Sequence, residues 1–252
     1  FLFGLLTACY TSNDKNATCA EDGRIARWLT TGDRTSSFEK TKGLSFLKKT
    51  DSQAVIEVDT TQQFQTIDGF GYALTGGSAD LINENLNAAQ RTALLKELFL
   101  TDKNGIGISY LRISIGASDL DDHVFSYCDL PPGKTDPELK NFTVEKDRKN
   151  LIPVLKEIIA LNPQIKIMGS PWSPPTWMKT NNLPKGGKLK PEYYATYANY
   201  FVKYITAMAK EGITIDAVTP QNEPEHPGNT PSMAMTAPEQ AEFVKNHLGP
   251  AF

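Results

Sequence analysis

A chain of 252 residues is long enough to bury one large hydrophobic core. Charged residues make up 22% of the chain and the formal net charge is −3, which excludes a basic stripe for nucleic acid and an acidic tail. Aromatic residues make up 10%, and because they serve both sugar-binding surfaces and ordinary cores, this fraction does not separate the two uses.

The first nine residues predict export. They are apolar and end in Leu6-Thr7-Ala8-Cys9, which is typical of the end of a secretory signal peptide. The same run resembles a bacterial lipobox, in which the cysteine is lipidated and becomes the mature amino terminus. Lipidation of Cys9 would anchor a periplasmic or cell-surface protein to a membrane without a spanning helix. A plain signal peptide and an unrelated apolar stretch are the alternatives.

Cysteine and histidine usage predicts neither a metal nor a cofactor. The three histidines are far apart in the sequence, and no cysteine and histidine cluster has ligand spacing. If Cys9 is lipidated, Cys19 and Cys128 remain as one candidate disulfide pair, and the sequence leaves open whether they pair.

The segment between Cys9 and the first strand is polar. Residues 10–53 are rich in Thr, Ser, Asn, Asp and Lys and predict an irregular tether that leads into the folded domain. Residues 54–58, Ala-Val-Ile-Glu-Val, alternate and are β-branched, so they predict a strand that opens a domain over 54–252.

Strands and helices then alternate. Strands are predicted at 64–70, 109–115, 165–170 and 215–219, and helices at 87–100, 147–161 and 191–210. Asn87 is the expected cap of the first helix, and Pro153 should kink the second helix or delay its start. Thr236 and Glu239 form a capping box that opens a further helix. A long loop, rich in Asp, Pro and Gly, is expected at 116–141.

This alternation indicates an α/β fold with a parallel sheet, either open and doubly wound or closed as a (β/α)₈ TIM barrel. No G-x-G-x-x-G loop follows the first strand, which disfavours the dinucleotide-binding version of the open sheet. Each predicted strand ends in polar or aromatic residues: Asp68-Gly69-Phe70, Arg112, Ser170-Pro171-Trp172 and Gln221-Asn222-Glu223. Because barrel enzymes place their chemistry at the carboxyl ends of the strands, we expect a (β/α)₈ barrel, truncated after about four β/α units.

Glu223 is the strongest catalytic candidate. It follows a β-branched strand directly, with Asn222 before it and Pro224 after it. Cleavage of a glycoside needs a carboxylic acid to protonate the leaving oxygen and a second carboxylate across the bond. An amide neighbour that can hold a sugar hydroxyl suits the first role. The plain alternative is a loop glutamate paired with a lysine.

Four sequence runs resemble one enzyme family. They are Ser170-Pro171-Trp172-Ser173-Pro174-Pro175-Thr176-Trp177-Met178-Lys179, then Ala217-Val218-Thr219-Pro220-Gln221-Asn222-Glu223-Pro224, and the two runs Ile67-Asp68-Gly69-Phe70-Gly71 and Tyr110-Leu111-Arg112-Ile113, which fall where the family has its first two barrel strands. Together they are similar to glycoside hydrolase family 30, the family of lysosomal glucosylceramidase and microbial β-1,6-glucanases. The resemblance covers about residues 54–252, and its long Trp-rich run is highly specific.

The resemblance implies a role for each matching residue. Glu223 would be the general acid/base, Asn222 would hold the sugar 2-hydroxyl, and Trp172 would wall the −1 subsite. Arg112 would bind the nucleophile and keep it ionised, whereas Trp177 is either a second substrate wall or packing. The family's nucleophile is a Glu after the seventh strand, which lies outside this chain. The family retains anomeric configuration through a double displacement.

One position departs from the family. Many members have Thr-Asp after the first strand, with the Asp gripping sugar hydroxyls, and Gly76 stands at that place here. We therefore expect an exported enzyme that cleaves β-1,6-glucan or a glucosylceramide-type β-glucoside, with the 252-residue chain inactive by itself. The alternative is a carbohydrate-binding lipoprotein that keeps the fold without catalysis.

Several residues of the long loop and its surroundings stay open. The carboxylates Asp119, Asp121 and Asp122 either line a subsite or belong to a solvated loop. Tyr127 either stacks on a sugar or packs against its own loop. His226 either touches a leaving-group sugar or is simply exposed.

Overall fold

The computed structural model describes residues 24–45, 57, 59–102 and 105–252. The chain divides into two compact units, Phe1–Gln65 and Thr66–Phe252, and each is described by itself. Lipidation at Cys9, the partner cysteine Cys19 and the strand expected at 54–58, apart from Glu57, lie outside the described residues. The segment boundaries at residues 9, 53 and 54 stay predictions.

The first unit contains a β-hairpin. Strands β1 (Arg24–Leu29) and β2 (Glu39–Ser45) pair antiparallel, with Trp28 opposite Lys40. The turn between them is closed by a hydrogen bond from the Thr31 amide to the Ser36 carbonyl (3.0 Å), and Asp33 accepts from the Thr35 amide. The expectation of an irregular tether is therefore wrong for residues 24–45. Both strands contain many polar and charged residues, so the sequence lacks the alternation of apolar and polar residues by which a strand is predicted.

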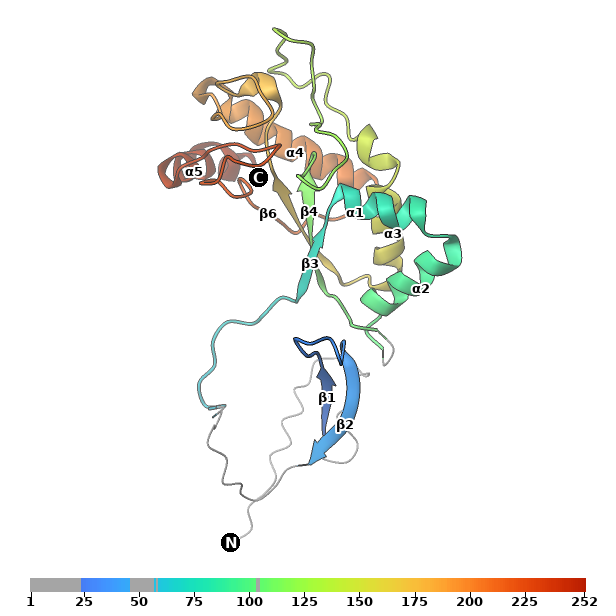
Figure 1. The fold of residues 1–252 in the computed structure, drawn as a ribbon. Helices are drawn as coiled ribbons and strands as arrows, with labels where there is room; N and C mark the ends of the chain where they lie inside the picture. The colour runs from blue at the N-terminus through green and yellow to red at the C-terminus, as the bar shows by residue number, and fades with distance from the viewer. Residues whose placement is uncertain (1–23, 46–56, 58, 103–104) are drawn as a thin grey trace. The chain divides into compact units, whose positions relative to one another are not determined.

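The second unit is built on a parallel sheet (Figure 1). Its four strands lie in the order β3 (Gly71–Leu74), β4 (Tyr110–Ile115), β5 (Lys166–Pro171) and β6 (Ala217–Val218). All three neighbouring pairs are parallel, so the carboxyl ends of the strands meet at one edge, which we call the rim. The long loop that follows β4 rises from this edge (Figure 1).

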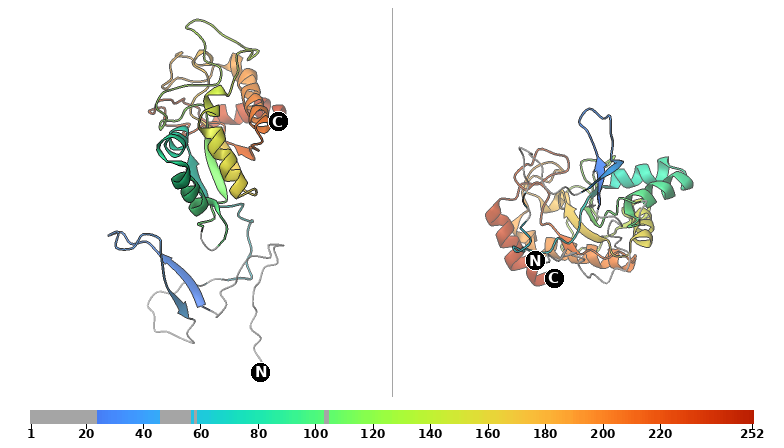
Figure 2. Two further views of the ribbon diagram at one scale, coloured as in Figure 1. Left: turned by 90° about the vertical axis from the view of Figure 1, so that its right-hand side faces the viewer. Right: turned by 90° about the horizontal axis from the view of Figure 1, so that it is seen from below.

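Helices cover the outside of the sheet. The α-helices are α1 (Gly76–Asp80), α2 (Ala88–Phe99), α3 (Leu151–Leu161), α4 (Tyr194–Lys210), α5 (Ala237–Phe243) and α6 (Gly249–Ala251). Viewed from below, α2, α3, α4 and α5 lie along an arc around the strands (Figure 2). The capping residues Asn87 of α2 and Thr236 of α5 act as the sequence predicts, each in a capping box. Within the described residues, no helix has the length and apolar character needed to cross a bilayer.

The first barrel strand starts later than its sequence predicts. Residues 64–70 form no strand, and β3 begins at Gly71. A Cβ on Gly71 would lie 1.4 Å from the Tyr110 carbonyl oxygen, so this close approach to β4 requires glycine. Asp68-Gly69-Phe70 consequently lies at the amino-terminal edge of the sheet, where the Phe70 carbonyl accepts from the Ser109 and Tyr110 amides. Its expected place at the rim is wrong.

The other elements follow the sequence closely. Pro153 delays the start of α3 to Leu151, after a 3₁₀ turn at Glu145–Arg148.

Tyr127 of the long loop is a core residue, 1% exposed, and its ring stacks on Tyr204 of α4 at 5.4 Å between centroids. Tyr127 is therefore a packing residue and does not offer its face to a sugar.

Candidate active site

Arg112 is the centre of a polar cluster at the rim. It projects from β4 and is half-buried, and its Nη2 donates to Ser170 Oγ at 2.9 Å and to Asn222 Oδ1 at 2.5 Å. Ser170 is the next-to-last residue of β5 and also shares a 2.6 Å hydrogen bond with Thr219. Burial lowers the pKa of Arg112, and the nearby carboxylates of Glu223 and Asp119 oppose that shift. One cation therefore links β4, β5 and the segment that follows β6.

Trp172 packs over this cation. The Arg112 guanidinium carbon lies 4.7 Å from the Trp172 ring centroid, a cation–π contact. The Trp172 indole N–H donates to Asp119 Oδ1 at 3.1 Å, so the loop after β4 fixes the orientation of the ring. The ring is 6% exposed. Asp119 thus belongs to the candidate site, although the sequence alone leaves it as an open alternative.

Asn222 is positioned by an extension of the sheet. After β6, the Thr219 amide donates to the Gly169 carbonyl and the Asn222 amide donates to the Pro171 carbonyl at 2.8 Å. The buried Gln221 side chain adds a 2.7 Å hydrogen bond from its Nε2 to the Trp172 carbonyl. These contacts hold residues 219–222 beside the end of β5, which brings the Asn222 amide to Arg112.

Glu223 lies at the point where the chain leaves the sheet. Its φ of 43° is in the left-handed region that few non-glycine residues adopt, so the backbone turns sharply here. The side chain is exposed, and its Oε2 accepts a 2.7 Å hydrogen bond from Asn229 Nδ2. An exposed carboxyl beside an amide and a half-buried cation can deliver a proton to a bound leaving group.

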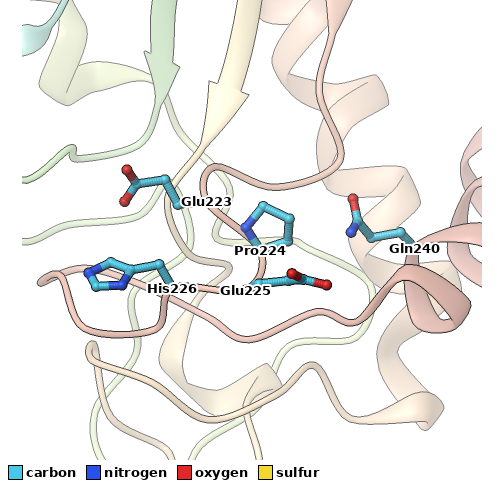
Figure 3. A pocket seen from close by; sticks show the side chains of 5 residues that line it. All are labelled: Glu223, Pro224, Glu225, His226 and Gln240. Carbon is cyan, nitrogen blue, oxygen red and sulfur yellow. The ribbon is translucent and has the colours of Figure 1, made fainter.

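A pocket of about 410 Å³ adjoins Glu223 and is lined also by Pro224, Glu225, His226 and Gln240. Figure 3 shows the side chains of Glu223 and His226 pointing to one side of Pro224 and that of Glu225 pointing to the other. The His226 side chain therefore lies on the same side of the chain as the Glu223 side chain. This arrangement is needed if His226 touches a leaving-group sugar, one of the two alternatives that the sequence leaves open.

Trp177 lies outside the Arg112 cluster. Its indole N–H donates to the Cys128 carbonyl at 2.9 Å and its ring meets Tyr193 edge-on at 5.1 Å. The side chain is 6% exposed, and it borders a second pocket of about 460 Å³, which is lined also by residues 130–135 and Lys190. Of the two sequence alternatives for Trp177, these contacts favour packing.

Gly76 begins α1 at the rim, and a neighbouring carboxylate occupies the space beside it. A Cβ on Gly76 would lie 1.9 Å from Asp121 Oδ1. The other oxygen of Asp121 is held by the Ser118 amide and hydroxyl, both at 2.7 Å. A side chain at position 76 would therefore require Asp121 to move away from its bonds with Ser118, whereas glycine leaves room for this carboxylate.

Sequence reasoning missed Asn229 and assigned no role to Ser170 and Thr219. Ser170 and Thr219 lie within the sequence runs that carry the family resemblance, but their contacts depend on partners 58 and 49 residues away. Asn229 lies in no such run, and its partner Glu223 is 6 residues away. Across the described residues, no three His, Cys, Asp or Glu side chains are grouped so that they could hold a metal ion. Cys128 is a buried free thiol, and burial beside Asp136 raises its pKa to about 12.

The model of the glycosyl hydrolase family 30 TIM-barrel domain matches residues 67–252, which include the whole parallel sheet and the Arg112 cluster. The chain belongs to glycoside hydrolase family 30. The fold is accordingly a TIM barrel, of which the described residues supply four parallel strands with their helices.

Relatives within family 30 carry two kinds of name. Over 193 residues the chain is 40% identical to an endo-1,6-β-D-glucanase of Neurospora crassa, which covers 74% of this chain and 39% of that protein. Over 240 residues it is 32% identical to the lysosomal acid glucosylceramidase of Mus musculus, which covers 91% of this chain and 45% of that protein.

A solved structure of an endo-β1,6-glucanase superposes with a TM-score of 0.78 at 40% identity, covering 90% of this chain and 49% of that chain. The SrfJ protein of Salmonella typhimurium superposes with a TM-score of 0.79 at 28% identity and the same coverage. The chain thus spans about half the length of these two solved structures, and less than half of the two curated relatives.

Proposed function

We propose that this chain is the acid/base half of a retaining β-glycoside hydrolase. Glu223 protonates the glycosidic oxygen as a nucleophile from the remaining part of the barrel attacks the anomeric carbon. In the second step, Glu223 accepts a proton from water, which attacks the covalent glycosyl-enzyme and releases the sugar. The nucleophile is the Glu that family 30 has after its seventh strand.

The observation that carries this proposal is the order of groups along the rim. Arg112, Asn222 and Glu223 follow one another, with the Asn222 amide held by Arg112 and the Glu223 carboxyl exposed. Trp172 supplies the wall of the −1 subsite, and the Asn222 amide nitrogen is available for a sugar 2-hydroxyl. Arg112 then assists the nucleophile as a nearby cation that favours its ionised form.

For the substrate, we propose a β-glucosidic bond, in β-1,6-glucan or in a glucosylceramide-type glucoside. The names of the Neurospora and mouse relatives support these two classes. A panel of β-1,6-glucan, glucosylceramide, an aryl β-glucoside and an aryl β-xyloside separates them. Because residues 1–9 are typical of an export signal, we also propose that the protein is exported and anchored by a lipid on Cys9.

The test of the acid/base is Glu223→Gln in the full-length protein. Hydrolysis of β-glucosides with poor leaving groups should fall by at least about 10³-fold, because no proton reaches the leaving oxygen. The kcat/KM for an activated aryl β-glucoside should fall far less, because that leaving group departs without protonation. Equal losses on both substrates, or unchanged rates, would contradict the assignment.

The 252-residue chain by itself provides a second arm of this test. It contains one of the two catalytic carboxylates in our proposal, so the purified chain should show no turnover of any substrate in the panel. A full-length protein that binds β-glucan yet hydrolyses nothing would instead support the alternative, a carbohydrate-binding lipoprotein on the same fold.

A further inference from the structure

The chain that follows Glu223 forms a closed loop. Residues 224–235 leave the rim and return to it, and the loop is closed at its base by a 2.8 Å hydrogen bond from the Met235 amide to the Pro224 carbonyl. The first turn is fixed by a 2.9 Å hydrogen bond from the His226 amide to the Glu223 carbonyl. We call residues 224–235 the acid/base loop.

The far side of the acid/base loop is anchored by buried donors. Lys179, 0% exposed, donates from Nζ to the Ser232 carbonyl at 2.7 Å and to the Pro184 carbonyl at 2.8 Å. The Ser232 hydroxyl donates to the Pro227 carbonyl and accepts from the Gly186 amide, both at 3.0 Å. These contacts fix the chain on both sides of Asn229, so the position of Asn229 does not depend on the Glu223 side chain.

Asn229 is the residue through which this loop reaches the catalytic candidate. Its Nδ2 lies 2.7 Å from Glu223 Oε2, and it is half-buried whereas Glu223 is exposed. An exposed glutamate has several side-chain rotamers, and holding it in one of them costs conformational entropy. A fixed amide donor selects one rotamer and occupies one carboxyl oxygen, which leaves Oε1 to exchange the proton.

We infer that Asn229 is the positioning residue of the acid/base, holding the Glu223 carboxyl in line with the glycosidic oxygen. This inference rests on the proposed function. A neutral amide suits the task because it orients the carboxyl in both of its catalytic forms without adding charge. Asn229 touches no reacting atom and acts through Glu223 alone.

The experiment compares two leaving groups in the full-length protein. Asn229→Ala should lower kcat/KM for a β-glucoside with a poor leaving group by about 10- to 100-fold, because proton delivery depends on the alignment of the carboxyl. The kcat/KM for an activated aryl β-glucoside should fall less than about threefold, since its departure needs no proton. A merely structural role would lower both values by the same factor.

Further variants keep the test decisive. Asn229→Asp has nearly the same shape but cannot donate when ionised, so it should lose at least as much as the alanine variant. Asn229→Gln keeps the amide and should recover part of the loss. Thr230→Ala, at an exposed neighbour in the loop, is the matched control, and thermal unfolding reports whether each variant is folded.

The outcomes separate this inference from the proposed function. If Glu223→Gln changes the ratio of the two kcat/KM values and none of the Asn229 variants does, the positioning role is wrong and the proposed function stands. If Glu223→Gln leaves the ratio unchanged, the acid/base assignment fails, and the positioning role fails with it.

Discussion

The two sides of the candidate site are held by different kinds of structure. Arg112 lies within β4, Trp172 directly follows β5 and Asn222 follows β6, and the Arg112 side chain contacts both of the others. Glu223, one residue beyond Asn222, is exposed at a left-handed turn, and a loop residue provides its hydrogen bond. The groups that would bind the sugar therefore have positions set by the sheet, while the group that would move the proton depends on a loop.

This difference has a physical consequence. Hydrogen bonds between paired strands fix the positions of the strand backbones. One cation, Arg112, is then enough to hold the side chains around it. A loop has no such repeat, and the acid/base loop depends on a few specific donors, above all Lys179. Damage to the sheet side should affect binding and chemistry together, whereas damage to the loop side should affect proton transfer selectively.

Among the substitutions of supporting residues, the largest effect should come from breaking the sheet side. Arg112→Ala leaves Asn222 Oδ1 and Ser170 Oγ without their cationic donor and removes the contact with Trp172. We expect kcat/KM to fall by about 10²- to 10³-fold for poor and activated leaving groups alike. Steady-state kinetics of the full-length protein measures this, with Arg148→Ala, a more exposed arginine, as control. A loss confined to the poor leaving group would show that the sheet side and the loop side do not differ as argued.

An intermediate effect should come from the loop anchor. Burial lowers the pKa of Lys179 from 10.5 to about 7, so between these pH values the unfolded chain binds a proton that the folded chain releases. The free energy of unfolding should therefore rise with pH across this window and stay level below about pH 7. Lys179→Met removes this dependence. The free energy of unfolding of wild type minus that of Lys179→Met should therefore increase by about 2–4 kcal/mol from pH 7 to pH 10.

Urea unfolding at pH 6.5 and pH 9.5 checks the sign. Lys185→Met, at an exposed lysine of the neighbouring segment, is the matched control and should show no such growth. If wild type and Lys179→Met keep a constant difference across the window, the buried amine is not the source of the pH dependence.

The smallest effect should come from the second tryptophan of the Trp-rich run. Trp177→Phe loses the hydrogen bond to the Cys128 carbonyl and should lower the free energy of unfolding by about 1–2 kcal/mol while changing kcat/KM less than about threefold. Trp172→Phe loses the bond to Asp119 and the larger ring over Arg112, so it should lower kcat/KM by about tenfold. Similar losses of activity in both variants would assign Trp177 to the substrate wall after all.

Much of the fold could be predicted because its signals are local. The helix caps at Asn87 and Thr236, the delay caused by Pro153 and the strand before Glu223 are each encoded within a few residues. The hairpin at 24–45 and the start of β3 at Gly71 could not be predicted. The first depends on cross-strand pairing, and the second on the close approach of the Tyr110 carbonyl, a contact 39 residues along the chain.

The sequence by itself determined the alternation of strands and helices, the membership of family 30 that its motifs imply, and the placement of Arg112 within a strand and of Trp172 and Asn222 after strands. Only the tertiary structure decided that Trp177 packs away from this cluster, that Asp121 fills the space beside Gly76, and that Asn229 holds Glu223. The reason is physical. Periodicity and capping are properties of neighbouring residues, whereas a hydrogen bond between two side chains depends on how the whole chain brings their atoms within about 3 Å.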